Sequence, residues 1–176
     1  MVSPPFFIEV VMHIQVLEEI DHEAILSEAN SIKVYLKKGW RDVTQIGIQG
    51  HKPNLNPEKE WKNSIGRVTK LQYPETYFKY PLFDTPIINR LMEKYSMIRT
   101  RIMLSDPKTC LTRHEDLSKR IHIPLVTNPD CLMIIEDSAY FLEPGKVYLT
   151  NTTLRHTAVN ASLFGRIHIV GCVYQN

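Results

Sequence analysis

The second half of the chain is a series of short segments in which apolar and polar residues alternate. Alternation with a period of two is typical of strands that bury one face. Turn signals separate the segments at 106–107, 128–130 and 143–145, where Gly145 can take a positive φ. The expected strands span residues 99–105, 120–126, 131–135, 139–142, 147–149 and 166–174. Strands at this spacing predict an all-β sandwich or barrel.

Helical spacing occurs only in the first half of the chain. A helix is predicted from just after Asp21 to about residue 38, with Gly39 as its C-terminal stop. Its apolar face would consist of Ile25, Ala29, Ile32 and Leu36.

A second helix is predicted with Thr85 as its N-cap and Pro86 in its first turn. Its apolar face would consist of Ile87, Leu91 and Tyr95. Residues 13–17 and 43–48 alternate like strands, whereas residues 50–64 are polar, contain proline and predict a long loop.

These patterns together predict a mainly β protein with flanking helices, of the α+β class. A length of 176 residues corresponds to one domain and allows a core that needs neither disulfides nor metal to fold. We therefore expect a single domain over residues 1–176. Residues 1–98 would form a helical or mixed support, and residues 99–176 most of the β core.

Charge and cysteine content exclude several classes of protein. Lys and Arg total 21 against 19 Asp and Glu, so the balance indicates neither a nucleic-acid partner nor a membrane surface. Cys110, Cys131 and Cys172 form no CxxC pair, and we expect free, buried thiols in a reducing cytoplasm. The apolar stretches at residues 4–8 and 10–12 are too short for a membrane anchor or a signal peptide.

One tripeptide is suited to holding a metal. In an extended segment, His114 and Asp116 point the same way, and His156 lies just beyond a predicted strand. Two imidazoles and one carboxylate on one face form the triad of non-haem Fe(II) oxygenases. Most His-x-Asp tripeptides are polar surface residues, so the spacing alone is a weak signal.

A nearby arginine strengthens the metal hypothesis. Arg166 lies ten residues after His156, on a strand that would neighbour the metal-binding strand in a closed barrel. Its guanidinium could hold a carboxylate through two parallel hydrogen bonds, whereas an inward arginine without a partner would be costly. The alternative is that Arg166 faces solvent or pairs with a structural acid.

At this point the sequence resembles the aspartyl/asparaginyl β-hydroxylase-like family of 2-oxoglutarate- and Fe(II)-dependent dioxygenases. The resemblance spans about residues 99–173, and it rests on the order and spacing of RTRIMLSDP, RHED, KRIHIPL, LEPGKVYLTN, RHTAVNAS and GRIHIVG. It implies a double-stranded β-helix (jelly roll), with His114, Asp116 and His156 as iron ligands. It also implies that Arg166 grips the distal carboxylate of 2-oxoglutarate and that O₂ is consumed.

The resemblance gives a role to two further residues that share one face of a strand. It implies His122 as a contact to 2-oxoglutarate and Arg120 as a contact to an acidic group of cosubstrate or substrate. Because the chain has Asp116, it looks like the full-triad bacterial or phage-type members. The animal enzyme acting on growth-factor-like domains lacks that acidic ligand, so its substrate is not carried over.

The expected function is hydroxylation of a C–H of an amino-acid residue in a peptide or protein, or of a free amino acid, with release of succinate and CO₂. Two alternatives are a non-catalytic jelly-roll module and a Zn or Mn cupin-type hydrolase or isomerase. Arg166 favours the first hypothesis, because a carboxylate clamp serves 2-oxoglutarate and has no evident use in a hydrolase.

Several residues keep two interpretations. His168 fits a hydrogen-bonded core histidine better than a site residue, and Asn160 and Ser162 fit turn roles as well as substrate contacts. Arg99 and Arg101 share a strand face and could bind an anionic substrate group or pair on the surface. An aromatic run is expected to pack the two halves together and could otherwise wall a pocket: Tyr73, Tyr77, Phe78, Tyr80 and Phe83.

Overall fold

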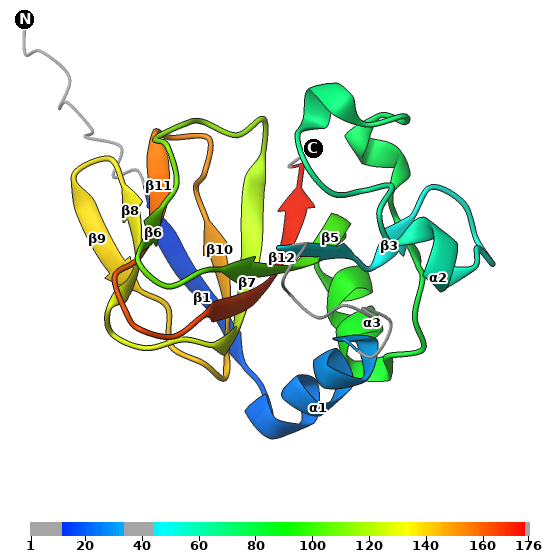
Figure 1. Cartoon of the computed structure of the whole chain (residues 1–176), viewed down its shortest axis with the longest axis horizontal. Coiled ribbons are helices and arrows are strands. Elements are labelled where there is room, and N and C mark those ends of the chain that lie inside the picture. Colours follow the sequence, from blue (N-terminus) through cyan, green and yellow to red (C-terminus); the bar gives the residue numbers. More distant parts are fainter. Residues whose placement is uncertain (1–11, 34–43, 175–176) are drawn as a thin grey trace, which may run out of the picture.

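A computed structural model describes residues 12–33 and 44–174 of the chain, and its centre is a six-stranded antiparallel sheet (Figure 1). The strands follow the order β1-β10-β7-β12-β5-β2. Their bounds are β1 Ile14–Glu19, β10 Lys146–Thr150, β7 Lys119–Val126, β12 Arg166–Val173, β5 Ile98–Ser105 and β2 Gln45–Gly47. The first half of the chain therefore contributes both edge strands of this sheet.

A second antiparallel sheet of four strands follows the order β6-β11-β8-β9. Its strands are β6 Thr109–Cys110, β11 His156–Asn160, β8 Cys131–Ile135 and β9 Ser138–Phe141. From β7 to β12 the chain passes back and forth between the two sheets, with β8 and β9 forming a hairpin in the four-stranded sheet, as in a double-stranded β-helix. The predicted mainly β jelly roll with flanking helices is confirmed.

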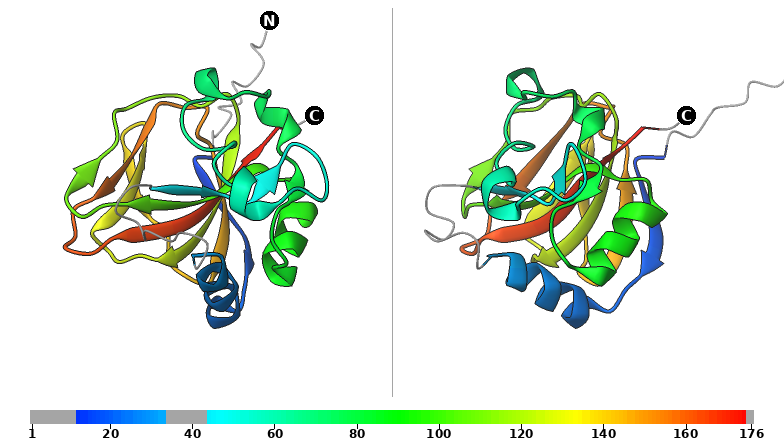
Figure 2. Two further views of the ribbon diagram at one scale, coloured as in Figure 1. Left: turned by 45° about the vertical axis from the view of Figure 1, so that its right-hand side comes forward. Right: turned by 90° about the vertical axis from the view of Figure 1, so that its right-hand side faces the viewer.

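Two helices cover the large sheet on the side away from the small sheet (Figure 2). In α1 (His22–Lys33) the predicted face is buried at Ile25, Ala29 and Ile32, whereas Leu36 and Gly39 lie outside the described residues. In α3 (Pro86–Lys94) the predicted face is rotated slightly. The fully buried residues of α3 are Ile88, Leu91 and Met92.

The start of α3 is capped from another helix. Thr85 occupies the predicted N-cap position, but its hydroxyl donates to Asn89 Oδ1 at 3.0 Å instead of capping the helix. The carboxylate of Glu28 in α1 accepts both the Ile87 and the Ile88 backbone N–H, each at 2.9 Å. A carboxylate at a helix N-terminus is favourable, so this contact fastens α3 onto α1.

The structure corrects other predictions. Residues 50–64 contain a short helix, α2 (Pro57–Glu60), whose first turn is capped by the Asn56 side chain. Residues 156–160 form strand β11, which is absent from the strands predicted from the sequence. The strand predicted at 43–48 is shorter: β2 ends at Gly47, and Val43 lies outside the described residues.

The short elements of the first half lie beside the barrel. A two-stranded sheet pairs β3 (Gln49–Gly50) with β4 (Tyr80–Pro81). Two 3₁₀ helices, η2 (Val68–Lys70) and η3 (Glu75–Tyr77), lie between α2 and strand β4 of this two-stranded sheet.

All three cysteines are free, and Cys131 and Cys172 are buried as predicted, but Cys110 is exposed. Within residues 12–33 and 44–174, no helix is long and apolar enough to cross a membrane. Residues 4–8, part of the apolar N-terminal stretches, lie outside the described part of the chain.

Candidate metal centre and binding cavity

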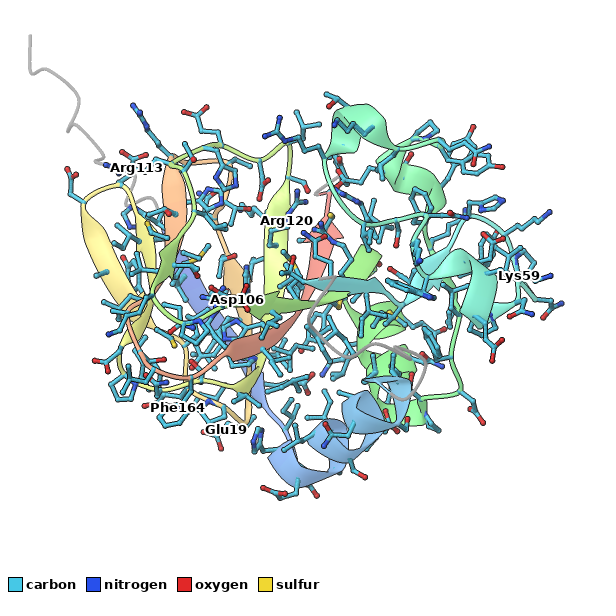
Figure 3. The ribbon with its side chains drawn as sticks, viewed as in Figure 1. Glu19, Lys59, Asp106, Arg113, Arg120 and Phe164 are labelled. Carbon is cyan, nitrogen blue, oxygen red and sulfur yellow. The ribbon has the colours of Figure 1, made fainter. Side chains whose placement is uncertain are left out.

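A cavity of about 680 Å³ opens at the end of the barrel, between the two sheets and a lip formed by residues 66–69. Figure 3 shows Arg120 inside the molecule, whereas Arg113 and Lys59 lie at its surface. The cavity is lined by Gln45, Gly66, Arg67, Val68, Thr69, Arg99, Arg101, Met103, Leu111, Thr112, His114, Asp116, Arg120, His122, Met133, Thr152, His156, Ala158, Arg166 and Val170. All six predicted site residues belong to this set.

The structure brings the three predicted metal ligands together. One potential ligand atom from each of His114, Asp116 and His156 lies within 4.8 Å of the other two. The two histidines exchange backbone hydrogen bonds, from His114 N to His156 O at 3.0 Å and in the reverse direction at 2.9 Å. Asp116 N donates to Thr152 O at 2.9 Å, which ties the end of the tripeptide to the loop before β11.

Both histidine rings are held in one tautomer by the backbone. His114 Nδ1 lies 2.7 Å from Thr112 O, and His156 Nδ1 lies 3.0 Å from Leu154 O. A carbonyl oxygen can only accept, so Nδ1 carries the proton in each ring and Nε2 keeps its lone pair. Burial lowers the pKa of His156, which favours the neutral ring that a metal requires. Each ring can thus offer the lone pair of its Nε2 to a metal ion.

Arg120 holds the carboxylate of the cluster. Its Nε donates to Asp116 Oδ2 at 3.1 Å, and its Nη1 donates to Ser118 Oγ at 2.6 Å. Its Nη2 lies 3.7 Å from Glu75 Oε1. Arg120 is therefore paired with two carboxylates of the protein itself.

Glu75 is a buried acid that the sequence analysis did not single out. It accepts from Arg99 Nη1 at 2.7 Å, from the Tyr174 hydroxyl at 2.7 Å and from Cys172 Sγ at 3.1 Å. Burial alone would raise the pKa of Glu75, but these hydrogen bonds and the charge of Arg120 lower it to about 2. No motif surrounds residue 75, so only the folded chain reveals this network.

Arg99 is locked in place by the same network. Its Nε donates to Ser64 O at 2.9 Å and its Nη2 to Gly66 O at 2.5 Å, and its φ of 48° is unusual for a bulky residue. The buried ion pair with Glu75 and these carbonyl contacts offset the backbone strain. Arg99 thus anchors the lip of the cavity and is not a surface residue.

Two other arginines of the cavity differ from Arg99 and Arg120. Arg166 is only 8% exposed, and its Nε has no hydrogen-bond partner in the described part of the chain. Arg101 is 6% exposed; its Nη1 donates to Gln45 Oε1 at 3.2 Å, and its Nε is likewise without a partner there. Burial lowers the pKa of Arg166, and burial with the charge of Arg99 lowers that of Arg101 to about 10. Both stay cationic at neutral pH.

His122 and His168 form a buried pair on the inner face of the large sheet. Their Nδ1 atoms are 3.5 Å apart, and both pKa values lie well below the usual value because of burial and the nearby charge of Arg166. Both rings are therefore neutral. His122 lines the cavity, while His168 lies behind it as a core histidine.

The remaining candidates lie away from the cavity. Asn160 Nδ2 donates to Ser105 O and Phe164 O, and Ser162 Oγ donates to Asn160 Oδ1, so this pair builds the turn between β11 and β12. None of the five residues of the aromatic run lines the cavity. Phe78 from that run is fully buried, in agreement with the packing interpretation.

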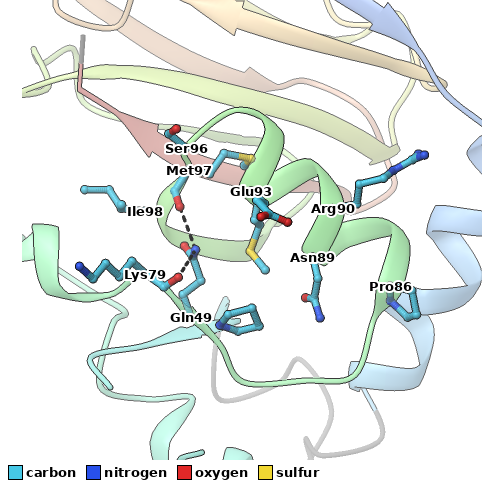
Figure 4. A pocket seen from close by; sticks show the side chains of 11 residues that line it. Gln49, Lys79, Pro86, Asn89, Arg90, Glu93, Ser96, Met97 and Ile98 are labelled. Atoms are coloured by element: carbon cyan, nitrogen blue, oxygen red, sulfur yellow. Dashed lines mark hydrogen bonds between the residues drawn. The ribbon is translucent and has the colours of Figure 1, made fainter. Parts of the chain in front are cut away.

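A second cavity of about 610 Å³ lies between α3 and the small two-stranded sheet (Figure 4). Its most buried polar residue, Gln49, donates to Met97 O at 2.8 Å and Lys79 O at 3.2 Å, and it accepts from Thr100 N. The amide is thus used entirely within the protein. No potential metal-binding cluster of described residues lies there.

Comparison with protein families decides the relationship. The model of the aspartyl/asparaginyl β-hydroxylase family matches residues 17–175. The chain belongs to this family. No match is found among the curated proteins.

Solved structures agree on the fold of this aspartyl/asparaginyl β-hydroxylase family member. An oxidoreductase of the 2OG-Fe(II) oxygenase family from Burkholderia pseudomallei is 12% identical, with a TM-score of 0.52 over 91% of this chain and 83% of the other. A non-heme monooxygenase, ThoJ, in a nickel complex is also 12% identical, with a TM-score of 0.50 over 90% and 72%.

A more partial likeness exists to the plu4264 protein from Photorhabdus luminescens, which is 14% identical with a TM-score of 0.39. The match covers 43% of this chain and spans 62% of the length of plu4264.

Proposed function

We propose that the protein is a 2-oxoglutarate- and Fe(II)-dependent dioxygenase. It hydroxylates a C–H of an amino-acid residue in a peptide or protein, or of a free amino acid, with O₂ as oxidant and succinate and CO₂ as coproducts. The observation that carries this proposal is one cavity that holds both the cluster of His114, Asp116 and His156 and the buried guanidinium of Arg166, whose Nε has no partner in the described part of the chain.

The donor set fits Fe(II). Two neutral imidazoles and one carboxylate are the ligands of the non-haem Fe(II) triad, and they leave coordination positions for other molecules. When bound, the metal and 2-oxoglutarate would together activate O₂, which supplies the oxidising power for C–H cleavage. The protein holds His114 and His156 in the Nε2-donating tautomer through two backbone carbonyls.

Arg166 fits the distal carboxylate of 2-oxoglutarate. An unpaired, buried guanidinium is costly, and a carboxylate ligand would supply both the opposite charge and hydrogen-bond acceptors. His122 lines the same cavity as a neutral ring, which suits it to a hydrogen bond with the cosubstrate.

The proposed role of Arg120 is to orient Asp116. Its Nε contacts Asp116 Oδ2 at 3.1 Å, and the same oxygen lies 3.7 Å from His156 Nε2, so the guanidinium fixes the carboxylate beside the histidine nitrogen. The expectation that Arg120 also contacts an acidic group of cosubstrate or substrate stays a prediction, because Asp116 and Glu75 already pair with its guanidinium.

The first test is an anaerobic titration of the metal-free protein with Fe(II) and 2-oxoglutarate. We expect the weak visible charge-transfer band of an Fe(II)–2-oxoglutarate complex, and its loss in Arg166→Ala. A second assay measures succinate formation, which should require both Fe(II) and 2-oxoglutarate. A folded protein that shows neither the band nor succinate would count against the dioxygenase and favour a non-catalytic module or a Zn- or Mn-dependent hydrolase.

A further inference from the structure

The walls of the cavity carry far more positive than negative charge. Its lining residues include five arginines and a single acid, Asp116. Arg67 is exposed on the lip, but the other four are at least nine-tenths buried: Arg99, Arg101, Arg120 and Arg166. Such a cluster persists only where opposite charge balances it.

The protein itself balances two of the four buried arginines. Glu75 lies 2.7 Å from Arg99, and Asp116 lies 3.1 Å from Arg120. Within the described part of the chain, no acid forms an ion pair with Arg101 or Arg166, so with both acids ionised these two arginines leave two positive charges without a paired acid. Bound Fe(II) and 2-oxoglutarate carry opposite charges of equal size, so their joint binding leaves this excess unchanged.

Arg101 points into the cavity because of its register in the large sheet. On β5 it pairs with Val170 of β12, which in turn pairs with His122 of β7, and residues paired in this way share a face. All three line the cavity. Gln45 Oε1 accepts from Arg101 Nη1 and from Gly66 N, each at 3.2 Å, so the amide links the guanidinium to the lip.

Arg101 and Arg166 occupy different parts of the cavity. Arg166 pairs with Ser105, which lies four residues beyond Arg101 on β5. At about 3.3 Å per residue, the two backbone positions are offset by roughly 13 Å along the strands. A dicarboxylate with its distal group on Arg166 therefore leaves Arg101 for another molecule.

We propose that Arg101, held by Gln45, determines substrate specificity by binding a carboxylate of the molecule to be hydroxylated. This inference rests on the proposed function, because it assigns Arg166 to the cosubstrate. The recognised group is an acidic side chain of a peptide residue or the α-carboxylate of a free amino acid. A carboxylate supplies the opposite charge and the acceptors that Arg101 Nε lacks within the described part of the chain.

The test measures ligand binding by NMR, without turnover. Isotope-labelled protein is first loaded with Zn(II), a diamagnetic metal that accepts the same nitrogen and oxygen ligands, and then with saturating 2-oxoglutarate. The Arg101 Nε–H signal, identified by its absence in Arg101→Gln, is then followed during addition of three probes. N-acetyl-aspartate α-amide carries only a side-chain carboxylate, N-acetylalanine only an α-carboxylate, and N-acetyl-asparagine α-amide carries neither.

We expect at least one carboxylate probe to shift the Arg101 signal saturably, while the neutral amide does not. The probe that binds identifies whether a side-chain or an α-carboxylate is recognised. Arg101→Gln should weaken that binding by about tenfold or more, and Arg101→Lys should weaken it less, because the charge remains without the planar fork. Arg90→Gln, an exposed arginine of α3 outside this cavity, should bind the probe like the wild type.

The Arg101 proposal is overturned if neither carboxylate probe binds the loaded protein, if the neutral amide binds equally well, or if Arg101→Gln binds like the wild type. Binding of 2-oxoglutarate by the Arg101→Gln variant shows that this variant is folded. Failure of the wild type to bind 2-oxoglutarate in the first step would instead count against the proposed function. In that case the same probes are titrated into the protein with Zn(II) alone, and the Arg101 criteria apply unchanged.

Discussion

At the scale of single residues, the centre of the proposed site consists of side chains that a few hydrogen bonds hold in place. Carbonyl oxygens hold the Nδ1 atoms of His114 and His156, and Arg120 holds Asp116. These contacts orient each donor before any ligand is present, which reduces the ordering needed on binding.

Replacing either histidine should remove the metal while sparing the fold. We expect His114→Ala and His156→Ala to abolish succinate formation and to weaken Fe(II) binding by more than about tenfold, because each removes one of three donors. Calorimetric metal titration and circular dichroism measure the two effects. His22→Ala, on α1, is the matched control, and normal turnover in either site variant would exclude the triad.

Arg166 should show opposite effects on stability and on cosubstrate binding. Without 2-oxoglutarate, Arg166→Met should be more stable than the wild type by about 1 kcal/mol or more, because an unpaired buried charge is removed. The variant should need more 2-oxoglutarate, because its binding of the cosubstrate should weaken by about 2–4 kcal/mol, as for a broken buried charge pair. Urea unfolding and the KM for 2-oxoglutarate measure these effects. Equal values for Arg166→Met and the exposed control Arg113→Met would place the clamp elsewhere.

At the scale of elements, long-range polar contacts fix segments that have little regular structure. Glu28 of α1 caps α3, and Glu75 of η3 joins β5 and β7 through Arg99 and Arg120. These contacts add to the strand pairs β1–β10 and β2–β5 in tying the first half of the chain to the barrel.

The interhelical cap should be measurable in the free energy of unfolding. Glu28→Ala leaves two N–H groups of α3 without their acceptor and should cost about 1–2 kcal/mol. Glu23→Ala, in the first turn of α1, loses only an interaction with the helix dipole and should cost less than about 1 kcal/mol. Chemical denaturation compares the two variants, and equal losses would contradict the cap.

Protonation of Glu75 should account for part of the loss of stability of the fold in acid. Its pKa is about 2 in the folded protein and near the ordinary 4.5 in the unfolded chain. The ionised carboxylate therefore stabilises the fold above about pH 4.5, and this contribution, about 3 kcal/mol, is lost as the pH falls towards 2.

The corresponding variant is Glu75→Gln, which leaves Arg99 without its buried counter-charge and should cost about 3–5 kcal/mol at neutral pH. Its stability should then fall less steeply with acid than that of the wild type. Urea unfolding at a series of pH values measures both slopes. The exposed control Glu93→Gln should follow the wild type, and a wild-type slope in Glu75→Gln would exclude the assigned role.

At the scale of the whole molecule, the described residues form a large apolar core and a smaller one at the four-stranded sheet, and the large core is separate from the candidate metal ligands. Residues from α1, α3 and the large sheet pack in this core, and none of its members is a candidate ligand. The site is therefore mounted on a scaffold that does not depend on it.

Removal of the metal should leave the protein folded. Chelation should lower the free energy of unfolding only by the free energy of metal binding, which is about 3–4 kcal/mol when the metal is present at 100 to 1,000 times its Kd. The melting temperature should fall accordingly. Near-ultraviolet circular dichroism should retain its folded signal, and re-addition of Fe(II) should restore the melting temperature. Cooperative unfolding on chelation would show that the cluster is structural.

The local sequence pattern determined which segments become strands and helices, because alternation and helical spacing act over a few residues. It also predicted that the side chains of His114 and Asp116 point the same way, since positions two residues apart in an extended segment share a face. Strand β11 was missed because its polar residues hide the alternation, and its burial depends on the partner strand.

Only the tertiary structure decided which charges are paired. Glu75 lies 24 residues from Arg99 in the chain, and Gln45 lies 56 residues from Arg101, and no local pattern links such positions. The sequence by itself therefore identified the arginines as candidates for anion binding. It could not separate Arg99, which Glu75 neutralises, from Arg101, which has no ion-pair partner among the described residues. That distinction depends on long-range contacts, because the free energy of a buried charge is set by the groups folded around it.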